Sequence, residues 1–493
     1  MKKSLVIMAL LSLFAAVSAQ NVDDALRYSQ VFYGGTARFM SMGSAFTALG
    51  GDMSSLSQNP AGIGVFRSSE FSVSPQLFRI NTKANFYGLS KDSKYNFNLN
   101  QIGVVSNLIS NESGLISLNF GYSFNKTNNL NQSVRIQGNN TNSSMADYWA
   151  NSNEGISYHD LGGAAGIAYD AWVIDTITGT GGRSYGTVFS NYGDNPPSVY
   201  GQNVRRLISN EGYTGEHALS IGGNYENKIF FGLTFGIHKI NYTSHYEHLE
   251  STSQTLPSEF KNFTYTDHFE NTGTGYSVKL GAIVKPTDAL RIGFAFHSPT
   301  WYKINEYYYE DLSSNFTYQN GHYEYSNDPA RYQYGLATPF RAMIGAAIQI
   351  KKIGLISADY EFADYSTARF YETGDNYDYT DKNNEIKNTL KATNNFRIGG
   401  ELRLNQLYLR TGYGYYGKAF ASGEDNENLD YSSVSFGIGF REKQVSLDLG
   451  FTSYMYDQKY FLYPLDNSYD PALARLNVAK NMFTLTLGYK FGY

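Results

Sequence analysis

The chain has 493 residues with a formal net charge of −5, and it contains 48 glycines, 43 tyrosines and 32 phenylalanines but no cysteine. An acidic chain offers no basic surface for nucleic acid, so nucleic-acid binding is excluded at the level of composition. The absence of cysteine excludes a disulfide framework and thiol catalysis. Beyond the first 19 residues no run of 18 apolar residues occurs, which excludes a helical membrane protein, whereas aromatic and glycine enrichment with polar alternation is typical of an outer-membrane β-barrel.

Residues 1–19, MKKSLVIMALLSLFAAVSA, have the pattern of a secretory signal peptide. Two lysines precede an apolar run from Leu5 to Val17, and Ser18 and Ala19 complete a small-residue cleavage site. The apolar run is shorter than the ~20 residues that a membrane-spanning helix needs. We therefore expect a cleaved leader and a mature chain that begins at Gln20, with no cysteine after the cleavage site for a lipid anchor.

Residues 20–67 follow neither a helical nor a strand period for long. Asp23 and Asp24 are placed to cap a short helical turn, Gly50-Gly51 ends the next helical pieces, and Asp52 can cap a further turn. Asn59-Pro60-Ala61-Gly62 predicts a turn, because proline holds φ near −65° and keeps the preceding residue out of the α region. We expect this segment, called the hatch below, to form a compact plug of short helices.

From Ser68 the period changes to two and stays so to the end of the chain. At the C-terminus six apolar residues from Phe483 to Tyr493 alternate with small or polar ones, as expected for a strand with one face in lipid and one toward a lumen. Similar segments predict strands near residues 69–80, 95–106, 115–125, 216–226, 229–246, 268–285, 289–309, 332–350, 353–372, 393–404, 406–420, 431–441, 444–462 and 480–493. The predicted fold is therefore all-β: a transmembrane antiparallel up-and-down barrel of about 14 strands over residues 68–493, with the hatch inside its lumen.

The predicted connections alternate between short and long. Outer-membrane barrels have short periplasmic turns and long extracellular loops, so this alternation places both termini in the periplasm. The longest connection is residues 126–215, in which Leu161, Ala165, Ala168 and Trp172 are at helical spacing and predict a helix within the loop.

Motifs for catalysis or for a metal are weak, and we predict that the protein is not an enzyme and holds no metal or cofactor. The segment from Gly412 to Ala419 resembles a phosphate-binding loop but lacks its final Ser or Thr and lies on a tyrosine-rich strand. No nucleophile elbow or EF-hand spacing occurs. His238 and His248 share one strand face while His245 opposes them, so a haem or metal site would need ligands from other strands.

The hatch resembles the N-terminal region of the FadL/TodX family of outer-membrane transporters for long-chain fatty acids and other hydrophobic compounds. The matching residues are Ala37-Arg38, Met42-Gly43, Ala45-Phe46-Thr47-Ala48, Asp52 and Asn59-Pro60-Ala61-Gly62, and weaker echoes follow in residues 290–298, 358–366 and 409–413. The resemblance implies hatch or gating roles for Gly43, Asp52, Asn59, Pro60, Ala61 and Gly62. It also implies lateral release of ligand at an inward kink of the third strand, near Phe120 and Gly121, where an interior glycine suits a bend.

The resemblance further implies a passive transporter in the outer membrane of a Gram-negative bacterium, a monomer whose partners are a hydrophobic small molecule and membrane lipid. The residues of the ligand pocket are not predicted. In this chain the longest loop follows the third strand, whereas the family's ligand-collecting helices lie on other outer loops. Two alternatives stay open: a haem or hemin receptor, favoured by the histidines toward the outer loops, and an adhesive or structural barrel that presents large loops.

Overall fold

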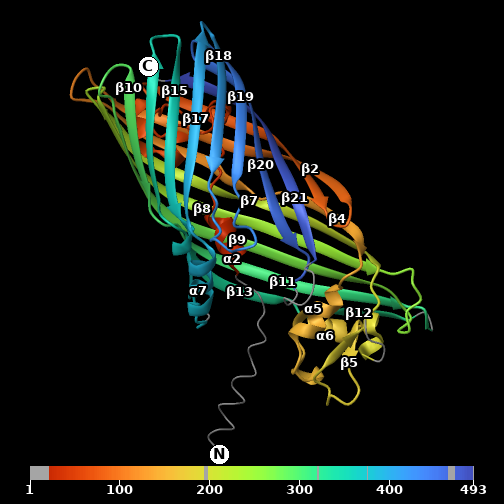
Figure 1. Ribbon diagram of the computed structural model, residues 1–493. Coiled ribbons are helices and arrows are strands. Elements are labelled where there is room, and N and C mark those ends of the chain that lie inside the picture. Colours follow the sequence, from red (N-terminus) through yellow and green to blue (C-terminus); the bar gives the residue numbers. More distant parts are fainter. Residues whose placement is uncertain (1–20, 194–197, 319–320, 375, 465–471, 492–493) are drawn as a thin grey trace, which may run out of the picture.

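The computed structural model describes residues 21–193, 198–318, 321–374, 376–464 and 472–491, so the predicted leader lies outside the described residues. The chain forms a closed antiparallel β-barrel of 14 strands, as predicted (Figure 1). Closure follows from β1, which pairs with β2 on one side and with β21, the last strand, on the other. Every backbone group of the wall can thus be paired without a free sheet edge, which a barrel in lipid requires.

The wall has 11 continuous strands and three that are each in two parts. In order around the barrel they are β1 (Ser69–Asn85), β2 (Leu89–Ser110), β3 (Leu115–Asn129), β7 (Gln202–Tyr225), β8 (Ile229–Ser251), β9 (Phe260–Val284), β10 with β11 (Leu290–His297, Trp301–Phe316), β13 with β14 (Ala330–Ala337, Arg341–Ile350), β15 with β16 (Gly354–Asp364, Arg369–Tyr371), β17 (Ala392–Leu404), β18 (Leu407–Tyr416), β19 (Tyr431–Glu442), β20 (Val445–Phe461) and β21 (Leu473–Phe491). The sequence predicted unbroken strands at 289–309, 332–350 and 353–372. The first two predictions are wrong at Pro299 and Pro339, which lack the N–H that a strand ladder needs. The third is wrong at residues 365–367, which form the 3₁₀ helix η5.

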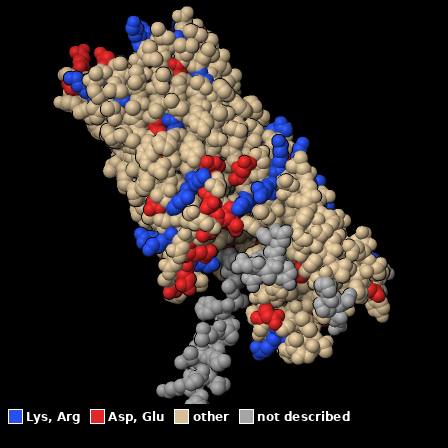
Figure 2. Space-filling model, viewed as in Figure 1, with Lys and Arg blue, Asp and Glu red and all other residues tan. Residues whose placement is uncertain are grey.

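The apolar positions predicted to face lipid are exposed on the outer surface of the wall. In β8, Ile229, Phe231, Leu233 and Phe235 are each 43–45% exposed, and further along the same face the exposed residues are polar. Figure 2 shows a broad uncharged surface over much of the wall, with charged side chains gathered at the short-turn tips and in the region of α7. None of the described helices is long and apolar enough to cross a membrane.

The two ends of the barrel differ. One end carries tight turns, at which Asn227, Lys351, Asn405 and Lys443 adopt the left-handed backbone conformation with φ between +48° and +57°. The other end carries the long connections, including α7 (Thr380–Thr389) (Figure 1). The last strand finishes at the short-turn end, beside the start of β1. A periplasmic location of both termini stays a prediction.

The long connection after β3 folds as a small subdomain at the long-loop end (Figure 1). Its elements are β4 (Gln132–Asn140), α5 (Met145–Ser152), η2 (Tyr158–Asp160), α6 (Gly163–Asp170), β5 (Ile174–Thr176), β6 (Tyr185–Thr187) and η3 (Val188–Gly193). Outside this subdomain, β12 (His322–Ser326) lies in another connection, and η5 (Tyr365–Thr367) lies in the break between β15 and β16. The predicted loop helix is confirmed at Ala165 and Ala168, which are buried in α6, while Leu161 and Trp172 flank that helix.

The hatch contains α2 (Val22–Ser29), α3 (Ala37–Ser41), α4 (Ser55–Gln58) and the 3₁₀ helix η1 (Pro60–Val65). The cap of α2 is Asn21, whose side chain accepts from the Asp24 N–H, while Asp23 and Asp24 occupy the first turn instead of capping it. Acidic residues there also suit the positive end of the helix dipole. Asn59 caps η1 by accepting from the Ala61 N–H, with Pro60 at the first helical position.

Candidate functional site

The hatch rests against a ring of glycines on the inner surface of the wall. At each of ten wall glycines, a Cβ atom would lie within 3 Å of a hatch atom between Ala37 and Ile63. We call this ring the glycine belt: Gly121, Gly222, Gly232, Gly281, Gly293, Gly345, Gly399, Gly412, Gly437 and Gly450. Neighbouring strands place these glycines opposite one another, as in the pairs Gly399↔Gly412 and Gly437↔Gly450. Only glycine allows the hatch backbone to approach the wall this closely.

Buried polar contacts join the hatch to the wall as well. Asp359 of β15 accepts from the backbone N–H and the hydroxyl of Thr47, at 2.9 and 2.8 Å. Arg38 of α3 pairs with Glu401 of β17 at 3.0 Å, and the same carboxylate pairs with Arg410 of β18 at 2.6 Å. Because these groups are buried, loss of one partner leaves a charge without compensation.

The six residues predicted to act in the hatch all lie in this interface or support it. The Asn59 amide donates to the Thr47 carbonyl at 2.6 Å, and Pro60 covers Gly232. Ala61 and Gly62 are fully buried in η1. Gly43 has φ of +61° and donates its N–H to Ser435 of β19. Asp52 accepts from the Thr36 hydroxyl at 2.8 Å. Their gating role stays a prediction.

The strand pairing is continuous at the predicted kink. Gly121 of β3 pairs with Val105 of β2 and with Ser220 of β7, and Phe120 points outward with 45% of its surface exposed. A Cβ at Gly121 would lie 2.8 Å from Leu56 of the hatch, so this glycine makes room for the hatch. A register shift lies directly beside this site, since Asn107 and Ile109 of β2 pair with the consecutive Asn119 and Leu118 of β3. Two further shifts, against β7, occur at residues 115–117 and 126–128 of β3. The lateral-gate role of the third strand stays a prediction.

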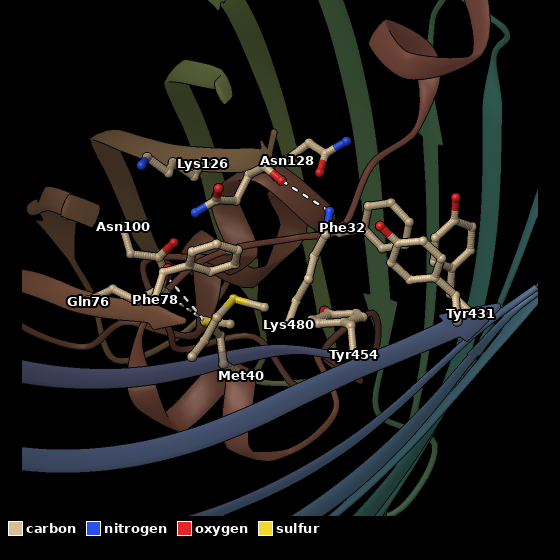
Figure 3. Close-up of a pocket in the computed structure, with 14 residues that line it drawn as sticks. Phe32, Met40, Gln76, Phe78, Asn100, Lys126, Asn128, Tyr431, Tyr454 and Lys480 are labelled. Carbon is tan, nitrogen blue, oxygen red and sulfur yellow. Dashed lines mark hydrogen bonds between the residues drawn. The ribbon is translucent and has the colours of Figure 1, made fainter. Parts of the chain in front are cut away.

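An apolar cavity of about 30 Å³ lies beside the hatch (Figure 3). It is lined by Phe32, Gly34, Met40, Gln76, Phe78, Asn100, Lys126, Asn128, Asn129, Tyr431, Tyr454, Tyr456, Lys480 and Met482. Phe32 comes from the stretch after α2 and packs against Tyr416, Tyr431 and Tyr454, with ring centroids 5.0–5.6 Å apart. The lining therefore combines strands from both ends of the chain, which is why sequence spacing did not reveal it.

Two lysines of this cavity have no acidic partner among the described residues. The Lys126 ammonium lies 5.0 Å from the centre of the Tyr213 ring. The Lys480 ammonium lies 5.6 Å from the ring of Tyr456 and 3.4 Å from the Asn129 carbonyl. By contrast, the nearby buried Lys279 pairs with Glu216 at 2.6 Å. Cations in an apolar cavity without a counter-ion are suited to bind an anion.

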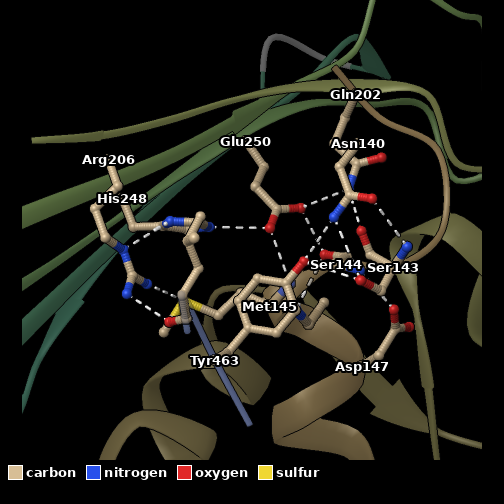
Figure 4. Close-up of polar contacts among 12 residues, drawn as sticks. Asn140, Ser143, Ser144, Met145, Asp147, Gln202, Arg206, His248, Glu250 and Tyr463 are labelled. Atoms are coloured by element: carbon tan, nitrogen blue, oxygen red, sulfur yellow. Dashed lines mark hydrogen bonds and ion pairs between the residues drawn. The ribbon is translucent and has the colours of Figure 1, made fainter. Parts of the chain in front are cut away.

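The histidines named for a haem site do not converge. His238 contacts Ser277 inside the barrel, His245 faces His268, and His248 lies between Arg206 and Glu250 (Figure 4). Within the described parts of the chain, no group of three or more His, Asp or Glu side chains is arranged to hold a metal ion. These histidines therefore give the haem alternative no support.

Glu250, at the outer end of β8, attaches the long-loop subdomain to the wall (Figure 4). Its carboxylate accepts from the Ser144 hydroxyl at 2.6 Å and from the Met145 N–H at 2.8 Å, at the first turn of α5. In the same turn, burial raises the pKa of Asp147 to about 7, although its hydrogen bonds from Ser144 and Tyr200 act to lower it. Trp149 of α5 packs on two aromatic rings of β9.

Comparisons with known proteins agree with this architecture. The family model described as "Outer membrane protein transport protein (OMPP1/FadL/TodX)" matches residues 210–491. A FadL homologue from Pseudomonas aeruginosa shares 13% identity, with a TM-score of 0.57 and coverage of 94% of this chain and 100% of that one. The toluene transporter TodX of Pseudomonas putida also shares 13% identity, with a TM-score of 0.52 and the same coverage. At this identity the structures show the fold alone, and no curated protein sequence matches. Since the family model covers more than half of the chain, the protein belongs to the OMPP1/FadL/TodX family of outer-membrane transport proteins, which are channels and not enzymes.

Proposed function

We propose that the protein carries amphipathic molecules with an anionic head group, long-chain fatty acids among them, across the outer membrane. The observation that carries this proposal is the apolar cavity with Lys126 and Lys480, neither of which has an acidic partner among the described residues. A ligand carboxylate would compensate both ammonium groups, and its hydrocarbon chain would gain about 0.8 kcal/mol for each CH₂ removed from water.

The cavity has room for about one water molecule, so ligand binding requires its side chains to move. Met40, Lys126 and Lys480 are unbranched and can change rotamer without displacing the wall. Phe32 lies on the hatch and not on a strand of the wall, so it too can move while the barrel stays closed.

The geometry supports passive transport by a monomer. The wall is closed by the β1–β21 pairing, so no second copy is needed to cover a sheet edge. The exposed apolar side chains of the wall suit a surrounding membrane, here the outer membrane of a Gram-negative bacterium, with both termini facing the periplasm. The hatch stays in the lumen while ligand leaves sideways.

A second candidate ligand is a neutral aromatic hydrocarbon. TodX, which has the same fold, is described as a toluene transporter. The rings of Phe32, Tyr431 and Tyr454 around the cavity favour such a ligand. A hydrocarbon ligand would leave both lysines without a counter-ion, so the lysines favour a carboxylate ligand.

The test compares oleate with an uncharged alcohol of the same chain length. Binding to purified protein and uptake by cells are measured for Lys126→Met, Lys480→Met and the double variant. Lys239→Met is the matched control, since Lys239 lies on the outer face of β8 and contacts Thr274. We expect the double variant to bind oleate at least tenfold more weakly and the alcohol unchanged. Equal oleate binding by the double variant and the wild type would refute the proposal.

A further inference from the structure

The inner surface of the wall carries arginines on the short-turn side of the glycine belt. Alternate residues of a strand face the same side, so a residue two or four positions from a belt glycine shares its inward face. Arg291 of β10 lies two positions from Gly293, and Arg441 of β19 lies four positions from Gly437. Both arginines are near the short turns, at the start of β10 and at the end of β19. They therefore point into the lumen at its short-turn end.

A cavity of about 300 Å³ lies at this level, against about 30 Å³ for the apolar cavity. Ligand sites commonly have volumes of about 300–1,000 Å³. Five basic side chains line the cavity, and we call them the basic cluster: Arg38 and Arg67 of the hatch, and Arg291, Arg441 and Lys490 of the wall. Within the described lining, Glu70 is the one acidic residue. The cavity thus has an excess of positive charge, to which hatch and wall both contribute.

The acidic groups next to the basic cluster are already paired. The carboxylate of Glu401 accepts from Arg38 at 3.0 Å and from Arg410 at 2.6 Å. Glu70 lies directly across from Lys490 on the neighbouring strand, with 4.0 Å between the carboxylate and the ammonium. These carboxylates compensate Arg38 and Lys490, and the other three members of the cluster remain.

Those three arginines, Arg67, Arg291 and Arg441, have no acidic partner in the part of the chain that the structure describes. Arg291 donates to the carbonyl of Leu49 in the hatch at 2.8 Å. Arg441 lies 4.9 Å from the centre of the Tyr408 ring, and its Nε is buried without a hydrogen-bond partner. Unpaired buried donors cost free energy, and like charges in one cavity repel each other. An anion between these side chains would relieve both effects.

The basic cluster is separate from the apolar cavity of the proposed function. Lys480 lines the apolar cavity and Lys490 lines the basic one, and the two are ten positions apart on β21. Ten residues of a strand correspond to about 33 Å. Solutes at the short-turn end can reach the cluster, because Arg67 is exposed and the Lys490 side chain is 45% exposed.

We propose that the basic cluster binds a phosphate group and that the bound phosphate fastens the hatch to the wall. A guanidinium presents a fork of N–H donors that matches the oxygens of a phosphate. The oxygens of a tetrahedral phosphate point in different directions, whereas the two oxygens of a carboxylate lie in one plane. Phosphate therefore suits arginines that approach from separate elements, here Arg67 of the hatch with Arg291 of β10 and Arg441 of β19.

Two sources can supply this group, inorganic phosphate in solution and the head group of a membrane phospholipid. The binding test uses purified protein in maltoside micelles, which contain no phosphate. Isothermal titration with inorganic phosphate is carried out at constant ionic strength, with chloride as the balancing anion, so that general screening does not enter. Short-chain phosphatidylglycerol is titrated in the same way, and diacylglycerol of the same chain length is its phosphate-free control.

The variant is Arg291→Gln with Arg441→Gln. Arg403→Gln is the matched control, because Arg403 is an exposed arginine at the same end of the barrel that contacts the Asn405 carbonyl and does not line the cavity. We expect the wild type and the control to bind one phosphate group per chain, and the double variant to bind at least tenfold more weakly. Folding is checked by migration on unheated gels.

A second measurement follows the hatch itself. Ala45→Cys places a single thiol at a fully buried position of the hatch in a chain without native cysteine. We expect phosphate to slow the reaction of this thiol with a labelling reagent at least threefold, and to have no effect when Arg67→Gln is also present. Since Arg67 is exposed, its replacement leaves the packing intact and keeps the test usable even where the double variant does not fold.

The outcomes separate the possibilities. Binding of inorganic phosphate alone assigns the site to a dissolved anion, and binding of phosphatidylglycerol alone assigns it to a lipid head group. Binding of neither, or equal binding by the wild type and the double variant, would show that the basic cluster is not a phosphate site. Binding without any change in the labelling rate would refute the fastening of the hatch. None of these results depends on whether oleate is transported.

Discussion

Replacing Gly399 with alanine tests whether the glycine belt holds the hatch. A Cβ at this position would lie 2.2 Å from the Met42 carbonyl oxygen, whereas ordinary contacts begin at 3.4 Å, so hatch or strand must move by more than an ångström. The adjacent Gly400 is the matched control, because there the nearest atom is the Leu355 oxygen at 3.8 Å. Neither glycine has a positive φ, so strain from the backbone does not enter the comparison.

Overpacking of this kind costs about 1–3 kcal/mol. Where the backbone conformation suits alanine, replacing glycine stabilises the folded protein by about 0.4–1 kcal/mol, because it lowers the conformational entropy of the unfolded chain. The two variants should therefore differ by about 1.4–4 kcal/mol in the free energy of unfolding. We would measure it by urea unfolding in lipid vesicles, followed by migration on unheated gels, and would record ion conductance in planar bilayers, which a displaced hatch should raise for Gly399→Ala alone. Equal stability and equal conductance of the two variants would refute the reasoning.

Two further predictions concern buried polar groups. Asn59→Ala removes the side-chain amide that caps η1 and donates to the Thr47 carbonyl. We expect the free energy of unfolding in urea to fall by about 1–3 kcal/mol. An unchanged urea midpoint would show that the cap is dispensable. Because burial raises the pKa of Asp147 to about 7 from 3.8, α5 docking is most stable below pH 3.8 and weakens as pH rises through 7. Burial raises the pKa of Glu250, which holds the same turn, to about 7 as well. The fluorescence of Trp149 should shift toward that of a solvated indole between pH 5 and pH 8, and Asp147→Asn with Glu250→Gln should abolish the shift.

The wall could be predicted well from the sequence because its signal is local. Each strand alternates lipid-facing and lumen-facing residues, so the C-terminal pattern from Phe483 onward was enough to identify β21. Closure into 14 strands followed from the number of such segments. The strand breaks were missed because the alternation continues across Pro299 and Pro339: the register on the two sides is the same, and only the missing N–H groups interrupt the ladder.

The cavity and the helices of the long loops could not be predicted in the same way. Lys126 and Lys480 are 354 positions apart in the sequence and meet only because β3 and β21 are both near β1 in the closed barrel. The acidic and amide-rich run that forms α7 reads as a solvated loop, since only Ile386 of that helix is buried. The glycine belt could have been noticed in the sequence. Most wall strands carry a glycine at the same level, and the alternation of lipid-facing residues does not explain why.

The glycine belt also has a consequence for how the barrel is assembled. Hatch atoms lie against glycines of wall strands from β3 round to β20, where a Cβ atom would not fit. A plug so closely matched to the wall has no route into a barrel that is already shut. We therefore expect the hatch to be in place before β1 pairs with β21, so that the later strands close around residues 21–67.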